Sequence, residues 1–362
     1  MDEIKFQQRA IDLAKESMGL VSPRPAVGAV IVIQGEIISE GKTLESPNDH
    51  AEASAIKNAQ RDLNNATLFC TLEPHNFTTH DIPCTDLIIQ SGIKKISCPK
   101  SDKNPKVNEK GFKQLEKAGI EIDRSWGLDQ LDQIDKLYES YDFMLKNKKP
   151  RVSAKFAMTL DGKIATSDNE SKWITSEDSR KRVHEIRNQS DAVITGINTI
   201  ISDDSKLTSR INNLPTGKPK YRVVLDNNAR LNESYEIYNN KSSGEVIWFT
   251  SKKPSHKNIP DHITNIKSKG DKISPKEVIE YLYQLGSYEI LIESGGTLLG
   301  SFFDQRLVNK VYAFISPSIF GGTSAPSPVG GKGIQKIIDK IKLTKTSVES
   351  IKEDILITGI ID

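Results

Sequence analysis

Cysteine is scarce in this sequence, which has only Cys70, Cys84 and Cys98 among 362 residues. An odd number of cysteines in a long chain argues against a disulfide framework. Residues 1–15 mix charged and apolar residues and lack the uninterrupted apolar stretch of a signal peptide. The sequence also lacks an apolar run long enough to span a bilayer. We therefore expect a cytoplasmic protein without a membrane segment.

A surplus of charge of either sign is also missing. The chain has 50 basic and 48 acidic residues, so nothing indicates a surface for nucleic acid or for an anionic membrane. We expect small-molecule partners instead. Internal repeats and low-complexity segments are absent too. At 362 residues the chain is long for one hydrophobic core and about right for two domains.

The N-terminal part opens with a helical pattern that ends near residue 19 and then alternates strand and helix patterns. The apolar run 27–33 predicts a buried strand with a hairpin partner at 37–39. Asp49 is a candidate cap for the helix that follows it. Further strands are predicted at 67–72, 93–98 and 120–122, with helices at 84–90 and 111–118. This order predicts an α/β sheet with functional residues at the strand ends.

A highly charged helical segment, 128–149, separates this part from a second alternation. We place a domain boundary at its end, which gives domains of residues 1–146 and 147–362. The second part has predicted strands at 151–158, 191–195, 221–225, 245–249, 289–293 and 310–315, and predicted helices at 176–189, 275–284 and 298–305. Strands separated by helices of this length predict a largely parallel sheet.

The segment between residues 50 and 84 has a pattern typical of a catalytic zinc site. His50 and Glu52 are two residues apart, His75 follows a predicted strand, and Cys84 opens the next predicted helix. Three such ligands hold zinc and leave its fourth position for water, while a carboxylate that is not a ligand moves protons. A single histidine at such a place is more often a packed or solvated side chain. Three candidate ligands in this order, with a glutamate two residues after the first, favour a metal site over packed or solvated side chains.

The motifs His50-Ala51-Glu52, Thr71-Leu72-Glu73-Pro74 and Pro83-Cys84 resemble the deaminase half of the bifunctional riboflavin-biosynthesis deaminase/reductase family. The eight residues between His75 and Cys84 match the spacing of that family's second and third zinc ligands. The resemblance implies a cytidine-deaminase-like α/β domain in which His50, His75 and Cys84 hold zinc. It also implies that Glu52 is catalytic, taking a proton from water and delivering it to the leaving ammonia.

The sequence departs from this family close to the site. Arg24 stands where the family has asparagine, His75 where it has a cysteine, and Asn76-Phe77 where it has serine and histidine. Imidazole suits zinc but lacks the charge of a thiolate, so the zinc would be more electrophilic and its water more acidic. Two interpretations stay open at this point. The domain is an active deaminase with a variant ligand, or it is a degenerate deaminase fold with a structural role.

The second half resembles the reductase of the same family, whose fold is similar to dihydrofolate reductase. The resemblance depends on Thr159-Leu160-Asp161-Gly162-Lys163, Gly196-Ile197-Asn198-Thr199, Leu207-Thr208-Ser209-Arg210 and Glu293-Ser294-Gly295-Gly296-Thr297, which occur in the family's order. It implies a dihydrofolate-reductase-like α/β domain that transfers hydride from NADPH to C1 of a ribosylamino sugar and opens the ribose to a ribityl chain. The nicotinamide carries the hydride, and the protein positions it.

The residue types suit this chemistry. Gly295 and Gly296 join a predicted strand to a predicted helix, where backbone N–H groups can approach phosphate, although such a pair alone is more often an ordinary turn. Arg187 and Arg210 can bind phosphate through charge-assisted hydrogen bonds, or they lie on a solvated helix face and a surface loop. Trp173 can pack on the cofactor, although tryptophan is more often a core residue.

The resemblance assigns the remaining roles. It implies NADPH contacts at Ala157, Trp173, Thr199, Asp203, Gly295, Gly296 and Thr297. It implies substrate contacts at Ser171, Arg187, Leu207, Arg210 and Glu293, and it implies a homo-oligomer. A third interpretation, a non-catalytic nucleotide-sensing or assembly protein built on both folds, also stays open.

Overall fold

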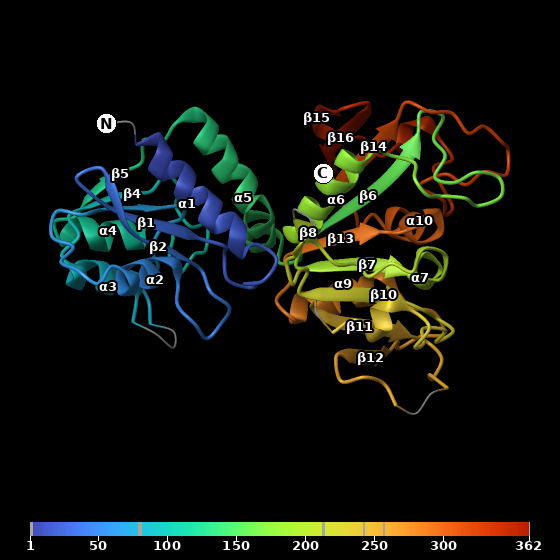
Figure 1. Cartoon of the computed structure of the whole chain (residues 1–362), viewed down its shortest axis with the longest axis horizontal. Helices are drawn as coiled ribbons and strands as arrows, with labels where there is room; N and C mark the ends of the chain where they lie inside the picture. The colour runs from blue at the N-terminus through green and yellow to red at the C-terminus, as the bar shows by residue number, and fades with distance from the viewer. Residues whose placement is uncertain (1–2, 79–81, 212–213, 242, 256–257, 362) are drawn as a thin grey trace. The chain divides into compact units, whose positions relative to one another are not determined.

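The computed structural model of the chain describes residues 3–78, 82–211, 214–241, 243–255 and 258–361. It divides into two compact units, Met1–Lys148 and Lys149–Asp362, each with its own sheet (Figure 1). In the part of the chain described, no helix is both long enough and apolar enough to cross a membrane.

The N-terminal unit is built on a five-stranded sheet with the strand order β2-β1-β3-β4-β5. Strand β1 pairs antiparallel with β2 and β3, whereas β3, β4 and β5 run parallel. The strands are β1 (Gly28–Ile33), β2 (Glu36–Lys42), β3 (Thr67–Cys70), β4 (Lys95–Ser97) and β5 (Glu121–Asp123). The helices are α1 (Ile4–Ser17), α2 (Ala51–Asn58), α3 (Cys84–Ser91), α4 (Lys110–Lys117) and α5 (Leu128–Asn147). The predicted hairpin and the predicted α/β class are confirmed.

The predicted cap of α2 is wrong. His50, and not Asp49, has the N-cap position, with an extended backbone at φ −71° and ψ 163°. Asp49 pairs instead with Lys57 on the last turn of the helix, at 2.5 Å between Nζ and Oδ1. His50 therefore enters the site from the end of α2, whereas Glu52 lies in its first turn.

Gly41 of β2 allows α2 to lie directly on the sheet. A Cβ atom at Gly41 would lie 2.2 Å from the carbonyl oxygen of Ala51 and 2.4 Å from the amide nitrogen of Ala55. Both are backbone atoms, so relief of the clash requires movement of the helix that carries the site. We expect Gly41→Ala to lower the free energy of unfolding by about 2 kcal/mol, measured by urea denaturation. Gly270→Ala, where the nearest atom is 3.5 Å away, is the control, and equal stability of the two variants would contradict this explanation.

The C-terminal unit is built on a nine-stranded sheet with the order β12-β11-β10-β7-β13-β6-β14-β16-β15. Neighbouring strands from β12 to β14 are parallel, and the last two pairs are antiparallel. The strands are β6 (Arg151–Thr159), β7 (Ala192–Gly196), β10 (Tyr221–Leu225), β11 (Glu245–Thr250), β12 (Ile263–Lys267), β13 (Glu289–Glu293), β14 (Lys310–Ser316), β15 (Thr344–Ile351) and β16 (Asp354–Ile360). The helices are α6 (Glu177–Asn188), α7 (Ile197–Asp203), α8 (Glu236–Asn239), α9 (Pro275–Gln284) and α10 (Gly296–Asp304). The short strands β8 (Arg210–Ile211) and β9 (Leu214–Pro215) pair outside this sheet.

The largely parallel sheet is confirmed, but its antiparallel end is not predicted from the sequence. The strand β15 has mostly polar side chains, and nearly all of them are exposed. It therefore lacks the apolar run or clean alternation by which a strand is recognised.

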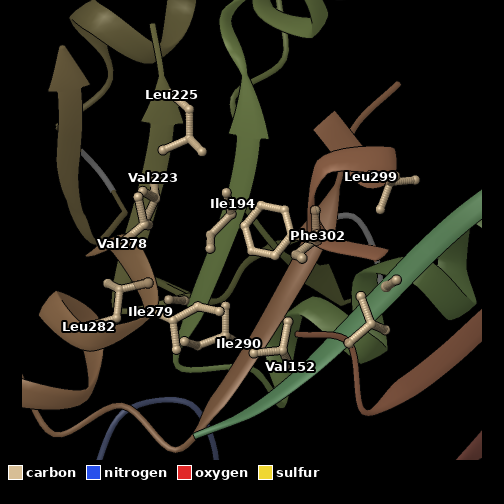
Figure 2. Packing of buried hydrophobic residues seen from close by; sticks show 14 of the residues in the cluster. Val152, Ile194, Val223, Leu225, Val278, Ile279, Leu282, Ile290, Leu299 and Phe302 are labelled. Carbon is tan, nitrogen blue, oxygen red and sulfur yellow. The ribbon is translucent and has the colours of Figure 1, made fainter. Parts of the chain in front are cut away.

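Apolar side chains fix the central strands of this sheet against α9 and α10. Figure 2 shows side chains from four neighbouring strands packed against those of the two helices: Val152, Ile194, Val223 and Ile290 with Val278, Ile279, Leu282, Leu299 and Phe302. Burial of each such side chain contributes about 1.5–3 kcal/mol. This core holds the carboxyl ends of β6, β7 and β13 at one edge of the sheet.

Candidate functional site

Three possible metal ligands of the N-terminal unit converge from three different elements. His50 precedes α2, His75 lies in the loop after β3, and Cys84 is the first residue of α3. One ligand atom from each lies within 4.8 Å of the others. The two imidazole rings have their centroids 4.4 Å apart. The structure thus brings together the three residues that the sequence predicted as ligands.

The chemistry of this donor set fits zinc. Two imidazoles and one thiol are borderline and soft donors, which are the usual protein ligands of zinc. Bond lengths of about 2.0–2.3 Å at tetrahedral angles place ligand atoms roughly 3.3–3.8 Å apart, so the 4.8 Å cluster needs only a small contraction around the ion. His75 and Cys84 are buried, whereas His50 is half-buried. The site is therefore open on one side, as a catalytic zinc site requires.

Glu52 lies beside the cluster without belonging to it. Its side chain is only 3% exposed, and the thiol of Cys84 donates a hydrogen bond to its Oε2 at 3.5 Å. Burial raises the pKa of Glu52 despite the opposing effect of its hydrogen bonds. A carboxyl group with this placement can exchange protons with a molecule bound next to the metal ligands.

Glu73 holds the loop that carries His75, a role that the sequence pattern does not reveal. Its buried carboxylate accepts hydrogen bonds of 2.9 to 3.3 Å from four backbone N–H groups: those of Asp102, Glu109, Gly111 and Phe112. Gly111 also lies against the neighbouring Pro74, because a Cβ there would be 2.1 Å from the Pro74 carbonyl oxygen. The position of His75 is thus tied to the start of α4.

Two of the residues that depart from the family pattern contact the segments that carry the ligands. Arg24 donates a hydrogen bond from Nη1 to the carbonyl oxygen of Asn48, at 2.5 Å, two residues before His50. The ring of Phe77 meets the ring of His75 edge-on, with centroids 5.5 Å apart. The Nζ atom of Lys106 lies over the ring of Phe77, 5.8 Å from its centroid. The hollow above the three ligands is lined by Asp49, His50, Ala53, Lys57, His75, Ile82, Cys84 and Leu87.

The second candidate site lies at the carboxyl edge of the large sheet. The neighbouring strands β7 and β13 are joined there by a hydrogen bond from the Thr195 hydroxyl to the Glu293 carbonyl oxygen, at 2.7 Å. The Gly196 amide donates to the hydroxyl of Ser294 at 3.3 Å. The helices α7 and α10 begin immediately after these two strands. Parallel sheets commonly bind ligands between two such helix starts.

Three of the residues expected to contact NADPH lie on elements that form or adjoin this edge. Thr199 and Asp203 lie on α7, and Ala157 lies on β6 next to β13. Trp173 is 70% exposed, with the Arg180 guanidinium 4.4 Å from its ring centroid, so it is not a core residue.

The two glycines of the expected NADPH loop differ. At Gly295, which caps α10, a Cβ would meet no atom within 4 Å. A Cβ at Gly296 would lie 2.4 Å from the carbonyl oxygen of Ser327. Gly296 therefore accommodates a loop of the protein, and Gly295, together with the exposed Thr297, faces open space.

Two residues expected at the substrate form a buried ion pair. Arg187 of α6 binds the carboxylate of Glu293 with two hydrogen bonds, of 2.5 and 3.0 Å. Lys155 of β6 approaches the same carboxylate at 3.3 Å. Burial alone would raise the pKa of Glu293, but the charges of Arg187 and Lys155 outweigh it and lower the pKa to about 2. Glu293 is therefore ionised at neutral pH, and it lies between Arg187 and Lys155.

The remaining expected residues are not all equally accessible. Arg210 is exposed on β8, and the Ser171 hydroxyl donates to the Asp203 carboxylate at 3.5 Å. Leu207 is only 1% exposed and belongs to the core. The motifs did not identify Lys155, which contacts Glu293, or His184, which contacts Arg210. A signal for Lys155 exists, since it is a charged residue within a predicted strand.

Sequence models of two known families match the chain. The model described as "RibD C-terminal domain" matches residues 150–357, and the one described as "Cytidine and deoxycytidylate deaminase zinc-binding region" matches residues 1–100. The riboflavin biosynthesis protein RibD of Actinobacillus pleuropneumoniae is 34% identical over 366 residues, with 100% of this chain and 96% of the relative covered. This chain belongs to the RibD family.

Solved structures agree with this family. A diaminohydroxyphosphoribosylaminopyrimidine deaminase/5-amino-6-(5-phosphoribosylamino)uracil reductase from Thermotoga maritima superposes with a TM-score of 0.81 at 33% identity, over 99% of this chain and 98% of that one. RibD of Acinetobacter baumannii, form 2, gives a TM-score of 0.80 at 30% identity, over 99% of both chains. The expected resemblance and both expected domain folds are confirmed.

As a member of the RibD family, the chain is a bifunctional deaminase/reductase of riboflavin biosynthesis. Its deaminase domain is of the zinc-binding type, and the expected cofactors, zinc and NADPH, are those of the family's two domains. The bifunctional interpretation is favoured over a reductase with a degenerate N-terminal domain, because the ligand cluster is retained despite the histidine at position 75.

Proposed function

We propose that the chain catalyses two consecutive steps of riboflavin biosynthesis. The first is the hydrolytic deamination of a 2,5-diamino-6-ribosylaminopyrimidinone 5'-phosphate. The second is the NADPH-dependent reduction of the resulting 5-amino-6-(5-phosphoribosylamino)uracil to its ribityl form. The observation that supports the first step most directly is the convergence of His50, His75 and Cys84 beside the buried Glu52.

In the deaminase, we assign His50, His75 and Cys84 as zinc ligands and Glu52 as the proton carrier. Zinc held by these residues would supply a Lewis acid that activates water for attack on the pyrimidine. Glu52 takes up the proton of that water and returns it to the leaving ammonia. Glu73 fixes the loop that carries His75, because its carboxylate accepts a hydrogen bond from the backbone N–H of Glu109.

In the reductase, the residues at the carboxyl edge of the sheet are assigned to the two ligands. NADPH supplies the hydride, and its contacts are Ala157, Trp173, Thr199, Asp203, Gly295, Gly296 and Thr297. The substrate contacts are Ser171, Arg187, Leu207, Arg210 and Glu293. Because the side chain of Leu207 is buried, we assign its contact to the backbone. The exposed guanidinium of Arg210 is the group best placed to bind the substrate's phosphate.

A single assay tests both steps. The purified chain is given the diaminopyrimidinone phosphate together with NADPH, and ammonia release and NADPH oxidation are followed in parallel. We expect ammonia release without NADPH, and NADPH oxidation only after deamination. NADPH oxidation on the deaminated substrate without any ammonia release from the first one would identify a reductase with an inactive N-terminal domain.

Removal of a zinc ligand should empty the site. We expect Cys84→Ala to reduce the zinc content from about one ion per chain to nearly none, because loss of one of three protein ligands removes a large part of the binding free energy. The measurement is metal analysis after gel filtration. Cys98→Ala is the matched control, since Cys98 is also a buried thiol but is not part of the ligand cluster. Equal zinc content in both variants would contradict the assigned ligands.

Three further assignments complete the proposal. We assign one activity to each domain, with the boundary near residue 146, in keeping with the two compact units of the fold. The scarcity of cysteine supports a cytoplasmic location. The family resemblance supports a homo-oligomer, and light scattering of the purified chain measures its mass directly.

A further inference from the structure

His184 contacts the proposed phosphate-binding arginine through both of its ring nitrogens. The backbone N–H of Arg210 donates to Nδ1 at 3.3 Å, and the Nη2 atom of the same residue lies 3.2 Å from Nε2. The hydroxyl of Ser209 donates to the carbonyl oxygen of His184 at 2.8 Å, which fastens this loop to α6. His184 is half-buried, whereas Arg210 is exposed.

These two contacts cannot both be hydrogen bonds to a neutral imidazole. A neutral ring has one nitrogen that accepts and one that carries a proton. The backbone donor of Arg210 is fixed in β8, so Nδ1 accepts from it and Nε2 carries the proton. That proton then points at the guanidinium, which also has only donors. Two donors 3.2 Å apart need an acceptor between them, and the exposed guanidinium is free to turn and share one.

The charges around His184 favour an anion as this acceptor. Arg187 follows it on α6, Arg210 faces it from β8, and Glu293 with its partner Lys155 faces it from the sheet. These are three cations against one carboxylate. Burial, followed by the charges of Arg187 and Arg210, lowers the pKa of His184 to about 4, against the opposing effects of Glu293 and the Thr208 carbonyl. The imidazole is thus neutral at pH 7 and carries a single proton.

We propose that His184 is a third donor to the phosphate of the reductase substrate, acting through Nε2–H next to Arg210 and Arg187. Through Nδ1 it also positions the backbone that carries Arg210. This inference rests on the proposed reductase function for the identity of the phosphate. The binding of an oxyanion by these residues, however, can be tested without the substrate.

Inorganic phosphate is the probe for the binding test. In the full chain labelled with ¹⁵N-histidine, and with the His184 signal assigned from a His184→Gln variant, we expect saturating phosphate to raise the titration midpoint of His184 by one unit or more. A bound anion stabilises the imidazolium, which is why the midpoint should rise. His262, a half-buried histidine of the same unit whose pKa is also lowered by burial, should not respond. An unchanged midpoint for His184 would overturn the proposal.

Kinetics provide the second test. We expect His184→Gln and His184→Ala to raise KM for the phosphorylated substrate roughly 10-fold, with a small change in kcat, because one hydrogen bond to a charged group is lost. For the dephosphorylated substrate the variants and the wild type should have equal KM. A KM that stays at the wild-type value for the phosphorylated substrate, or a rise that is the same for both substrates, would overturn the role of His184. Failure of the wild type to oxidise NADPH would instead contradict the proposed function itself.

Discussion

Replacement of Glu52 by glutamine should reduce ammonia release by roughly a thousandfold, the usual contribution of a positioned acid–base group. Glutamine keeps the shape of the side chain but can neither accept nor deliver the proton. The zinc content should not change, because Glu52 lies next to the ligand cluster and is not part of it. A coupled ammonia assay and metal analysis of the same preparation measure both quantities.

The matched control for this variant is Glu40→Gln in the same unit. Glu40 pairs with Arg9 at 2.6 Å on the partly exposed side of β2 and has no assigned role, so ammonia release should remain at the wild-type rate. NADPH oxidation on the deaminated substrate should also persist in Glu52→Gln, since the reductase residues belong to the other unit. Ammonia release within tenfold of wild type in Glu52→Gln would contradict the proton-carrier role. Loss of zinc would instead identify Glu52 as a zinc ligand.

The zinc cluster could be predicted from the sequence because two ligands flank the starts of helices and the third lies in the loop after a strand. His50 is followed by α2, and Cys84 opens α3. The boundaries of such elements are visible in the apolar pattern, and strand ends of one sheet meet at a common edge. Only the detail that His50 caps its own helix required the structure, since Asp49 is chemically the better cap.

The support of the cluster could not be predicted in the same way. Glu73 is held by backbone N–H groups that follow it by 29 to 39 residues. A backbone donor is present in every residue except proline, so such a partner leaves no mark on the amino-acid types of that segment. The same reason hides the contact between Nδ1 of His184 and the backbone of Arg210.

The order of the strands in the large sheet could not be predicted from the sequence either. The register of β6 on β13 places Lys155 directly opposite Glu293. These two residues are 138 positions apart in the sequence, and helical and strand patterns give the elements but not their neighbours in a sheet. The resemblance to the family identified Glu293 as a functional residue, whereas the structure adds the lysine beside it.

Removal of Arg187 should destabilise the C-terminal unit strongly. The side chains of Arg187 and Glu293 are only 16% and 7% exposed, so Arg187→Met would leave the carboxylate buried with the more distant Lys155 as its only cation among the contacts described. Loss of one partner of a buried ion pair typically costs 3–5 kcal/mol. We therefore expect a fall of about that size in the free energy of unfolding, measured by urea denaturation, together with loss of NADPH oxidation.

Acid should weaken the same interaction in the wild type. Burial would raise the pKa of Glu293, but Arg187 and Lys155 lower it from 4.5 to about 2. The folded carboxylate thus binds a proton less readily than the unfolded one, so its stabilising effect is complete above about pH 4.5 and is lost as the pH falls towards 2. In Arg187→Met the pKa of Glu293 should be higher, and this loss should begin at a higher pH.

A second substitution separates the uncompensated charge from the loss of packing. Arg187→Met combined with Glu293→Gln should recover part of the stability lost in Arg187→Met, because the buried group is then neutral. Lys181→Met on the same helix is the control, since its ion pairs with Glu177 and Asp178 are exposed to solvent and their removal should hardly change the urea midpoint. If the double variant is no more stable than Arg187→Met, the stability is lost because the aliphatic part of the arginine side chain no longer packs. The uncompensated charge of Glu293 is then not the cause.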